Sequence, residues 1–530
     1  FAPGATDVGE GDLVMVTGTA GEFNGMTQIS AGASTVMVVS SGNALPSPAS
    51  IDLPVPLAIG IDDYYEPSEG MRVRFIDPLY ASEYFQLLRF GEVRLTEGGR
   101  VPQFTAINPP DVAGYIEYQD RFARRQIILD DDRNGSNSLP VAGGVIFHPR
   151  PDGFGVGLQG MDFFRGGDVV SSLVGVLEFA FGSWRVRPTE IIPVAFTVNN
   201  PRPDEPESVG GRLKVASFNV LNYFTTIDDG TTTCGPLNIG CRGANSSAEL
   251  TRQRDKLVGA LATIDADVVG LVELENNASE SLQSLIDGLN AVVGTGTYSY
   301  IDTGTIGSDA IKVGLLYKAA TVTPTGLTAV LDSQGFVDPN DTGTPRNRPA
   351  LAQTFEESST GAAMIVVVNH FKSKGSSCGA GDDSPDDGQG NCNGTRAGAA
   401  TELLNWLATD PTGTGDPDVL ITGDLNAYAK EDPISAILNA GYTDLIRQFE
   451  GDAAYSFVFD GQIGYLDHAL ASSTLAPQVT GVTEWHINAD EVNVFDYNDD
   501  VRDAGEESFE EKPDGNELYE PDAFRSSDHD

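Results

Sequence analysis

The stretch Val419-Leu-Ile-Thr-Gly-Asp-Leu-Asn426 is an apolar run that ends abruptly in a glycine, an aspartate and an asparagine. Its four β-forming residues, bounded by Gly423, predict a buried strand. Side-chain alternation past the glycine directs Asp424 and Asn426 to the same side at the strand's end. A carboxylate and an amide placed there can jointly hold a phosphate oxygen, a water molecule or a hard cation. In isolation, Gly-Asp-x-Asn is more often a simple turn, so the rest of the chain has to decide between the two interpretations.

Other predicted strands in the second half of the chain also end in polar side chains that can bind a metal ion or a phosphate. The residues at these ends are Asn219, Glu273, Asn369 with His370, Asp467, and Asp528 with His529. If the strands pack side by side, their ends converge on one edge of the sheet, where catalytic groups are usually mounted. One polar ending is compatible with a turn, but six of them together predict a site.

Strands and amphipathic helices alternate through this second half. Strands are expected at residues 213–220, 267–273, 311–317, 350–355, 364–370 and 419–424, and helices at 249–261, 278–292 and 396–407. These assignments rest on apolar runs of strand length and on apolar residues that recur at helical spacing. The alternation is typical of a layered α/β or α+β domain.

The first half of the chain consists of short strand-like runs separated by glycine and asparagine turns, without a helical period of useful length. We interpret it as all-β, with small barrels of the oligonucleotide/oligosaccharide-binding (OB) type. The predicted domains are a partial barrel at 1–60, a second barrel at 65–198, a Pro/Gly/acid-rich linker at 199–211 and a larger domain at 212–530. The chain is therefore expected to have several domains.

Aromatic and basic residues share one segment of the second predicted barrel, which begins with a strand expected at 84–90. Tyr84, Phe85, Phe90 and Tyr118 alternate with Arg89, Arg121, Arg124 and Arg125. Such a surface can stack nucleic-acid bases or sugars. The alternative is that the aromatic residues lie in the core and the arginines keep the rim soluble, which is the commoner arrangement.

Acidic residues outnumber basic ones by 77 to 32, which gives a net charge of -45. Such a surface repels nucleic acid at long range. A nucleic-acid substrate would therefore require divalent cations and a local cluster of Arg or Lys. The sequence contains no run of 18 apolar residues, so we expect no membrane-spanning helix and no membrane partner. Phe1-Ala-Pro-Gly4 is not a signal peptide and leads directly into strand-like sequence, as if the start had been removed or lay elsewhere.

The four cysteines form two close pairs, Cys234 with Cys241 and Cys378 with Cys392, inside loops rich in Gly, Asn and Asp. Four cysteines allow three connectivities, and pairing within each loop closes the shortest rings. Neither pair has the spacing of a metal finger, and no histidine lies nearby to complete a zinc site. We therefore predict two local disulfides, which implies a secreted, extracellular protein.

Six motifs in the second half carry a resemblance to a known family. They are Ser217-Phe-Asn-Val220, Gly270-Leu-Val-Glu-Leu-Glu-Asn276, Val368-Asn-His-Phe-Lys-Ser373, Thr422-Gly-Asp-Leu-Asn426, Tyr465-Leu-Asp-His468 and Ser526-Ser-Asp-His529. In this order they resemble the signature of the endonuclease/exonuclease/phosphatase superfamily over residues 212–530, which implies the four-layer, deoxyribonuclease-I-like β-sandwich. With the β-rich front half and the paired cysteines, the chain resembles large extracellular nucleases secreted by Gram-negative bacteria. The family usually continues into a final strand beyond the last motif, so we expect the end at Asp530 to be clipped.

The resemblance implies a catalytic divalent cation. Asn219 and Glu273 would bind it, and Asp528 would complete or neighbour the site. Mg²⁺ is the expected ion, with Mn²⁺ and Ca²⁺ as alternatives. Carboxylate and amide oxygens suit these hard cations.

The resemblance also assigns the groups around the phosphate. Asp424 and Asn426 would position the attacking water and the scissile phosphate, Asp467 would orient His529, and His370 would stand on the other side of the phosphate. Phosphodiester hydrolysis needs a base for the water, charge neutralisation and a proton for the leaving oxygen, and these residue types supply all three. Which histidine is the base and which the acid stays open.

Cationic side chains near these motifs are candidates for substrate binding. Arg346 and Arg348 form the best local phosphate clamp in this acidic chain, with solvated surface charges as the alternative. Asp309 would orient His370 or contact the cation. Lys372 and Lys374 would contact a nucleic-acid backbone.

The predicted function is that of a secreted, divalent-metal-dependent endodeoxyribonuclease without sequence specificity, monomeric, acting on extracellular DNA, with RNA as an alternative substrate. A second hypothesis keeps the fold and site but exchanges the substrate for a lipid or other phosphoester. An enzyme acting on lipids would expose an aromatic loop for membrane contact, and the sequence has no clear one. A third hypothesis, a calcium-binding adhesion protein, predicts degraded motifs, whereas all six are intact.

Overall fold

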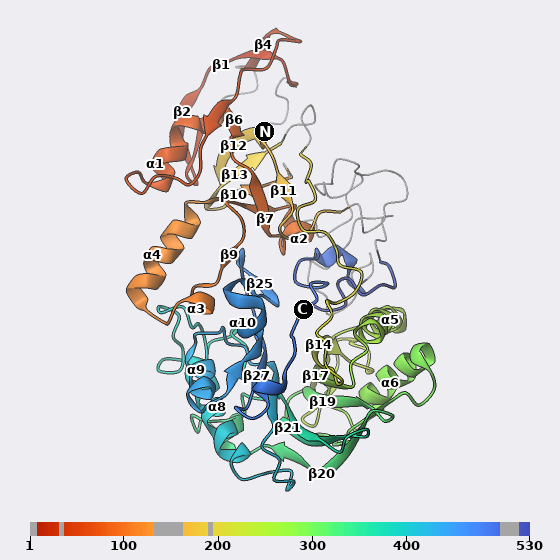
Figure 1. Cartoon of the computed structure of the whole chain (residues 1–530). Coiled ribbons are helices and arrows are strands. Elements are labelled where there is room, and N and C mark those ends of the chain that lie inside the picture. The colour runs from red at the N-terminus through yellow and green to blue at the C-terminus, as the bar shows by residue number, and fades with distance from the viewer. Residues whose placement is uncertain (1–7, 31–35, 132–162, 189–193, 499–518) are drawn as a thin grey trace.

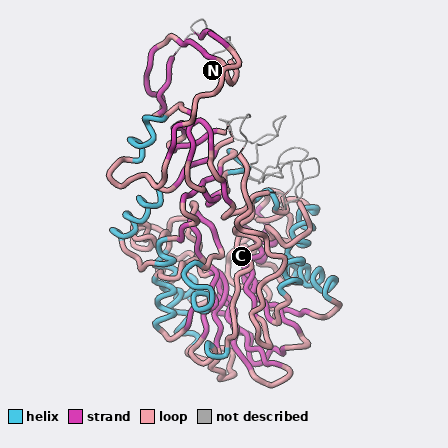
Figure 2. Tube along the Cα trace, turned by 45° about the horizontal axis from the view of Figure 1, so that its top comes forward, coloured by secondary structure: helices cyan, strands magenta, loops and turns pink. Residues whose placement is uncertain are grey.

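The computed structural model describes residues 8–30, 36–131, 163–188, 194–498 and 519–530. A strand-rich front part lies at the top of Figure 1, and the second half of the chain forms a sandwich of sheets and helices below it. Figure 2 shows the same division, with the helices of the second half on the outer sides of its strands. No helix within these described ranges is long and apolar enough to cross a bilayer.

The first sheet of the sandwich has four strands. Their order is β14 (Val215–Tyr223), β17 (Val268–Glu275), β19 (Ile311–Lys318) and β18 (Tyr298–Tyr300). β14 and β17 run parallel, and the other pairs are antiparallel. Helices α5 (Ser247–Ile264) and α6 (Glu280–Val293) bury their apolar faces against one side of this sheet.

The second sheet has six strands. Their order is β20 (Val322–Leu331), β21 (Ala350–Glu357), β22 (Ala363–His370), β23 (Val419–Asp424), β27 (Asp467–Ala471) and β24 (Thr443–Asp444). The helices α7 (Gln334–Val337), α8 (Asn393–Leu407) and α9 (Asp432–Asn439) pack on its outer face. Helix α10 (Leu445–Glu450) lies beside β27.

Apolar side chains of the two sheets meet in one buried cluster, which includes Val268 and Val313 from the first sheet and Phe355, Val366 and Val368 from the second. Helix, sheet, sheet and helix therefore form four layers, as the resemblance implied. The strands and helices expected here all exist, with ends within a few residues of those predicted. The apolar run at 419–424 is β23, buried along its whole length.

Gly423 is required by the close approach of β22 and β23. The two strands are parallel, with Asn369 opposite Gly423 and His370 opposite Asp424. Gly423 has φ = 112°, and a Cβ on it would lie 2.1 Å from the Asn369 carbonyl oxygen. Only glycine combines this backbone conformation with this contact.

We expect Gly423→Ala to lower the free energy of unfolding by about 3 kcal/mol or more, because backbone strain adds to an overlap with main-chain atoms. Gly413→Ala is the matched control, since Gly413 also has positive φ (71°) but a Cβ on it would have no neighbouring atom within 4 Å. That control should cost about 1 kcal/mol. Chemical denaturation measures both, and equal losses would refute the steric argument.

The front part contains one sheet of eight strands. Its order is β11 (Val169–Val170), β7 (Leu79–Glu83), β8 (Val93–Glu97), β10 (Gln126–Leu129), β13 (Ser183–Arg187), β12 (Val174–Ala180), β6 (Arg72–Phe75) and β5 (Ala49–Ile51). β10 with β13 and β5 with β6 are parallel pairs. The strand-rich character is confirmed, whereas a closed OB-type barrel is not.

Two sequence predictions for the front part are wrong. The strand expected at 84–90 is instead the short helix α2 (Leu87–Phe90), which ends at Gly91 in the left-handed region. Helix α4 (Val112–Ala123) was not expected at all. Asp111 caps it by accepting a hydrogen bond from the Gly114 N–H, and Phe122 is its one buried residue. Val112, Tyr115, Ile116 and Phe122 recur at helical spacing, but the sequence interpretation overlooked this short repeat among strand-like runs.

The aromatic and basic residues of this segment serve the fold. The Tyr84 hydroxyl donates to the Ala489 carbonyl, and the Tyr118 hydroxyl donates to that of Pro102 at 2.7 Å. Arg124 forms an ion pair with Asp120, one turn earlier in α4. The alternative of core aromatics and a soluble rim therefore describes these side chains better than a base-stacking surface.

Residues before β5 form two exposed antiparallel pairs of strands. β1 (Leu13–Val16) pairs with β4 (Val36–Ser40), and β2 (Thr19–Phe23) pairs with β3 (Met26–Ser30). Both are two-stranded in the described part of the chain. The partial barrel expected at 1–60 stays a prediction, and β5, which lies inside that range, pairs with the larger front sheet.

The front part and the sandwich share main-chain and core contacts. β9 (Val101–Pro102) pairs with β26 (Gln462–Gly464), which also pairs with β25 (Phe457–Phe459). Residues Val492, Val494 and Phe495 lie in the apolar core of the front sheet. The expected limits 65–198, 199–211 and 212–530 stay predictions, but these contacts cross them, so the two parts are joined firmly.

Candidate active site

Three of the predicted polar strand ends lie side by side at one edge of the second sheet. The register of β22, β23 and β27 sets His370 beside Asp424 and Asp424 beside Asp467. The distance from His370 Nε2 to Asp424 Oδ2 is 3.6 Å. The sequence prediction that these strand ends converge is correct.

Several residues at this edge have unusual backbone conformations. Glu273 has φ = 68°, Asn426 has φ = 49°, and Leu221 and Asn222 each have φ = 47°. Non-glycine residues in the left-handed region cost free energy and persist where the surrounding structure enforces them, often at functional sites. Four of them, three in the first sheet and Asn426 directly after β23, make this region a candidate functional site.

His529 and Asp467 form a buried pair. His529 Nδ1 lies 2.7 Å from Asp467 Oδ2, and the Ser456 hydroxyl donates to the same oxygen at 2.7 Å. Burial alone would lower the pKa of His529, but the Asp467 and Asp528 carboxylates outweigh it and raise that pKa well above its ordinary value. With Nδ1 engaged, Nε2 is the nitrogen available to a substrate.

His370 is held from the opposite side by Arg348. Arg348 Nη1 donates to His370 Nε2 at 3.2 Å, and Arg348 Nε donates to Asp309 Oδ2 at 2.9 Å. Burial and the Arg348 charge hold the pKa of His370 well below its usual range. The cation on this side is therefore Arg348, and the imidazole is neutral. Asp309 reaches the histidine through Arg348 and not by direct contact, which corrects that part of the expectation.

Asp424 is fixed by its neighbour in the motif. Asp424 Oδ1 accepts from the Asn426 main-chain N–H and Oδ2 accepts from the Asn426 side-chain amide, both at 2.7 Å. Burial raises the pKa of Asp424 to about 7, with the nearby His529 acting in the opposite direction. The Gly-Asp-x-Asn sequence is thus a turn that also locks one carboxylate in place.

Asn219 and Glu273 lie within β14 and β17, at irregularities in the register of these strands, and Asp528 lies in the last loop; the two strands continue past the residues at which the sequence predicted their ends. Asn219 Oδ1 accepts from the Leu221 N–H at 2.8 Å, and Glu273 Oε2 accepts from the Asn222 N–H at 3.0 Å. Burial and the Asp528 charge raise the pKa of Glu273. Two carboxylates that disfavour each other's charge, with an amide oxygen nearby, fit a hard divalent cation, which would offset the repulsion.

A second grouping of possible metal ligands exists among the described residues. Asp424, Asp467 and His529 offer ligand atoms within 4.8 Å of one another. This group overlaps the catalytic residues, so the position of a cation and the roles of these side chains depend on each other.

Both predicted disulfides are present, Cys234 with Cys241 and Cys378 with Cys392. The second of them contacts Arg346, whose Nη1 lies 3.4 Å from Cys378 Sγ. Of the predicted clamp, only Arg348 touches His370. The remaining histidine of the motifs, His468, is buried, with Nε2 2.8 Å from the Ala427 carbonyl oxygen.

Residues 216–529, more than half of the chain, match the model of the Endonuclease/Exonuclease/phosphatase family. The chain belongs to this family. Its members are phosphoester hydrolases that typically depend on divalent metal ions, and the oxygen ligands described above fit that requirement. No curated protein matches the chain.

Solved structures similar to this family member share little sequence with it. One is an endonuclease/exonuclease/phosphatase family protein from Bacteroides thetaiotaomicron, with 16% identity, 51% of this chain and 84% of that chain covered, and a TM-score of 0.34. A mannosyl-6-phosphatase from the same species has 16% identity and a TM-score of 0.34, and the match covers 49% of this chain and 86% of the phosphatase. D. rerio TDP2, complexed with a single-strand DNA product, has 15% identity and a TM-score of 0.32, and the match covers 49% of this chain and 85% of TDP2.

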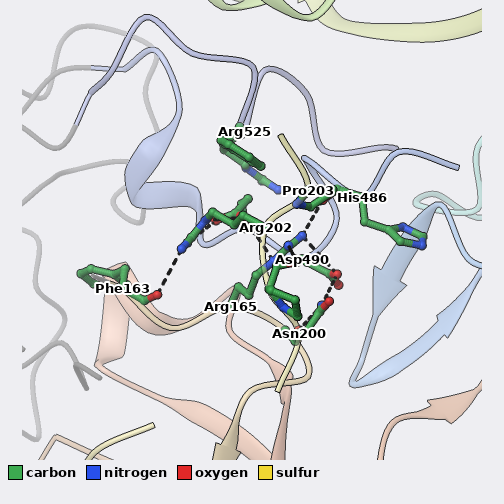
Figure 3. A network of polar contacts seen from close by, with 12 residues as sticks. Phe163, Arg165, Asn200, Arg202, Pro203, His486, Asp490 and Arg525 are labelled. Atoms are coloured by element: carbon green, nitrogen blue, oxygen red, sulfur yellow. Dashed lines mark hydrogen bonds and ion pairs between the residues drawn. The ribbon is translucent and has the colours of Figure 1, made fainter. Parts of the chain in front are cut away.

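A buried polar network, drawn in Figure 3, joins the front part of this family member to its last loop. Asp490 accepts from Arg165 Nη2 at 3.3 Å, from Arg100 Nη1 at 2.5 Å and from the Asn200 amide at 2.6 Å. Arg165 and Asp490 have no exposed side-chain surface. Buried charges of this kind are tolerated only when paired and hydrogen-bonded, so the network fixes the two parts relative to each other.

The same network reaches the residues next to His529. His486 Nδ1 lies 3.0 Å from Asp530 Oδ2, and Asp530 Oδ1 accepts from the Asn488 N–H at 2.7 Å. The Asn488 amide in turn donates to the His529 carbonyl at 2.7 Å. Nothing in the local sequence of residues 486–491 indicates that they hold the last loop in place.

Proposed function

We propose that the chain is a secreted, divalent-metal-dependent nuclease that hydrolyses phosphodiester bonds of extracellular DNA endonucleolytically and without sequence specificity, and that it acts as a monomer. The observation that carries the proposal is a single cluster of catalytic side chains. His529 pairs with Asp467, and His370 lies between Arg348 and Asp424, with its Nε2 3.2 Å from Arg348 Nη1 and 3.6 Å from Asp424 Oδ2. A tetrahedral phosphoryl group needs a proton acceptor, a proton donor and a cation around it, and these groups supply them.

The proposed reaction uses each of these side chains once. Asp424, held by Asn426, accepts the proton that the attacking water loses. His529, held as an imidazolium by Asp467, gives its Nε2 proton to the leaving alkoxide. The two groups lie close together, so the proton returns from Asp424 to His529 after each turnover. Arg348 neutralises a phosphoryl oxygen beside the neutral His370.

Asn219, Glu273 and Asp528 would hold the metal ion in this proposal. When bound, Mg²⁺ or Mn²⁺ would supply Lewis acidity to the phosphoryl oxygens. This chain would present oxygen ligands from two strands and a loop, and would keep Glu273 in its strained conformation beside Asn222.

Secretion is supported by both disulfides and by the strongly acidic composition. Disulfides persist in oxidising compartments and are rare in the cytosol. A high net charge keeps a protein soluble outside the cell.

We also propose that the front sheet is an OB-type barrel that helps to hold the substrate. β7 is the second strand from one edge of the sheet and β6 is the second from the other edge, although only residues 76–78 separate them in the chain. Together they act as one bent strand that joins the two sides of the sheet. The parallel pairing of β10 with β13 is also typical of the proposed topology.

The rival within the family is a phosphatase or phosphodiesterase that acts on a lipid or another small phosphoester. The purified chain can be given linear double-stranded DNA, RNA, p-nitrophenyl phosphate and vesicles that contain a phosphoinositide or sphingomyelin, all with Mg²⁺. The proposal expects hydrolysis of DNA with little release from the monoester or the vesicles. Release from either of these, with intact DNA, would replace the nuclease by the rival.

A further inference from the structure

Cationic side chains gather around His370 although acidic residues dominate the chain. Burial is the main cause of the lowered pKa of His370, and the charges of Arg348, Arg242 and Lys372 add to it. Burial also lowers the pKa of Lys372, with Arg348 and Arg346 acting in the same direction. Bringing like charges together costs free energy, and a chain with 77 acidic residues could have paired them. An anionic partner that binds there would offset the cost.

Two of these cations lack the usual partner. Within the part of the chain that the structure describes, neither Arg346 nor Lys372 forms an ion pair with a carboxylate. Arg346 contacts Cys378 Sγ at 3.4 Å, and its buried Nε has no hydrogen-bond partner. Lys372 Nζ donates to the Ser373 and Ser376 hydroxyls, each at 3.1 Å. The lysine two residues on is different, because Lys374 is ion-paired with the buried Glu431.

Arg242 follows directly after the first disulfide. Cys234 and Cys241 pack with Phe224, Ala310 and Ile311 in a small apolar cluster. This packing sets the loop against the segment that carries Asp309, and Arg242 Nη2 lies 3.4 Å from Asp309 Oδ1. The other oxygen of Asp309 accepts from Arg348, so one carboxylate connects Arg242 to the cation beside His370. The Arg242 side chain is still 41% exposed and can reach a bound anion.

The second disulfide is braced in a similar way. Asp383 accepts from the N–H groups of Cys378 at 2.9 Å and Cys392 at 2.7 Å, which holds both ends of the disulfide. The Arg346 side chain contacts Cys378, and the Arg346 main-chain N–H donates to the Val337 carbonyl at 2.6 Å. Each disulfide therefore supports one arginine close to the catalytic residues.

We propose that Arg242 and Arg346, positioned by the two disulfide-closed loops, bind with Lys372 the phosphates that flank the scissile phosphate, so that the site selects polynucleotides over small phosphoesters. The inference rests on the proposed function and deepens it. Guanidinium groups bind phosphates in a directional, charge-assisted way, which suits a repeating phosphate backbone. Small phosphoesters have no flanking phosphate and gain nothing from these residues.

The test uses the full chain with Arg242→Gln, Arg346→Gln and the double variant. Arg447→Gln is the matched control, because its side chain is also 41% exposed and forms a single ion pair, with Asp452. The substrates are a DNA duplex and bis(p-nitrophenyl) phosphate. We expect KM for DNA to rise roughly fivefold to tenfold for each arginine removed, while kcat stays nearly constant. Because each arginine would contact one phosphate, the slope of log KM against log salt concentration should fall by about one for each arginine. Hydrolysis of the small diester should not change.

The results separate the inference from the function on which it rests. A parent that cleaves DNA while both variants match the Arg447→Gln control would overturn the flanking-phosphate proposal alone. Equal losses on DNA and on the small diester would also overturn it, because the arginines would then act on the scissile phosphate. A parent that hydrolyses the small diester but not DNA would refute the nuclease proposal, and this inference with it.

A separate experiment tests whether the Cys234–Cys241 disulfide acts through Arg242. Cys234→Ser/Cys241→Ser should raise KM for DNA in the same direction as Arg242→Gln, and the combined variant should add little to either change. Additive effects would show that the disulfide does not act through Arg242. Because the loss of a disulfide also lowers stability, thermal unfolding is followed for each variant and the kinetics are measured below the lowest transition.

Discussion

His529→Ala is expected to lower kcat on DNA by about 10²-fold to 10⁴-fold, the range that positioned proton transfer contributes. Asp467 holds Nδ1 of this imidazole at 2.7 Å, and its charge favours the protonated form that the proposed reaction needs. Steady-state kinetics on a DNA duplex measure the loss, and thermal unfolding checks that the variant is folded.

Asp467→Asn provides the linked control for this prediction. It should also lower kcat, and the double variant should be little worse than His529→Ala alone, because the two residues act as one unit. A His529→Ala variant that keeps more than about a tenth of the parent's kcat would contradict the dyad's role in proton transfer.

Glu273→Gln is expected to raise the Mg²⁺ concentration needed for half-maximal activity by about 10²-fold or more, since even outer-shell changes at metal sites cost about 10-fold to 100-fold. Isothermal titration with Mn²⁺ measures cation binding independently of activity. Glu356→Gln, an exposed change in the same domain, is the matched control and should bind the cation as the parent does.

This experiment also decides between the two possible metal groups. If Glu273→Gln binds the cation like the parent while Asp424→Asn does not, the ion sits among Asp424, Asp467 and His529. The assignment of Asn219, Glu273 and Asp528 would then be wrong, although the family would not change.

The sandwich could be predicted from sequence because its signals are local. β23 begins with the apolar run Val419-Leu-Ile421, which is typical of a strand buried on both faces, and Asp424 is its last residue. Strand order is fixed by pairing between distant segments, yet the converging edge could be anticipated because parallel neighbours bring their ends together. His370 and Asp424 meet for that reason.

The parts that the sequence did not predict depend on long-range contacts or on weak local patterns. Arg165 and Asp490 are 325 positions apart, and nothing near either residue indicates a buried ion pair. Helix α4 buries only Phe122, and its short apolar repeat was overlooked among strand-like runs. Arg242 was missed as well, although its position directly after Cys241 was the available signal. Such residues acquire their meaning only when the fold brings their partners together.

The most direct measurement is incubation of the purified chain with closed circular plasmid, once with Mg²⁺ and once with a chelator, resolved on an agarose gel. The account predicts nicked circles first, then linear and smaller fragments, in the Mg²⁺ sample alone, because a metal-dependent endonuclease cuts internal bonds. Intact plasmid in both samples, or equal cleavage with the chelator, would contradict it.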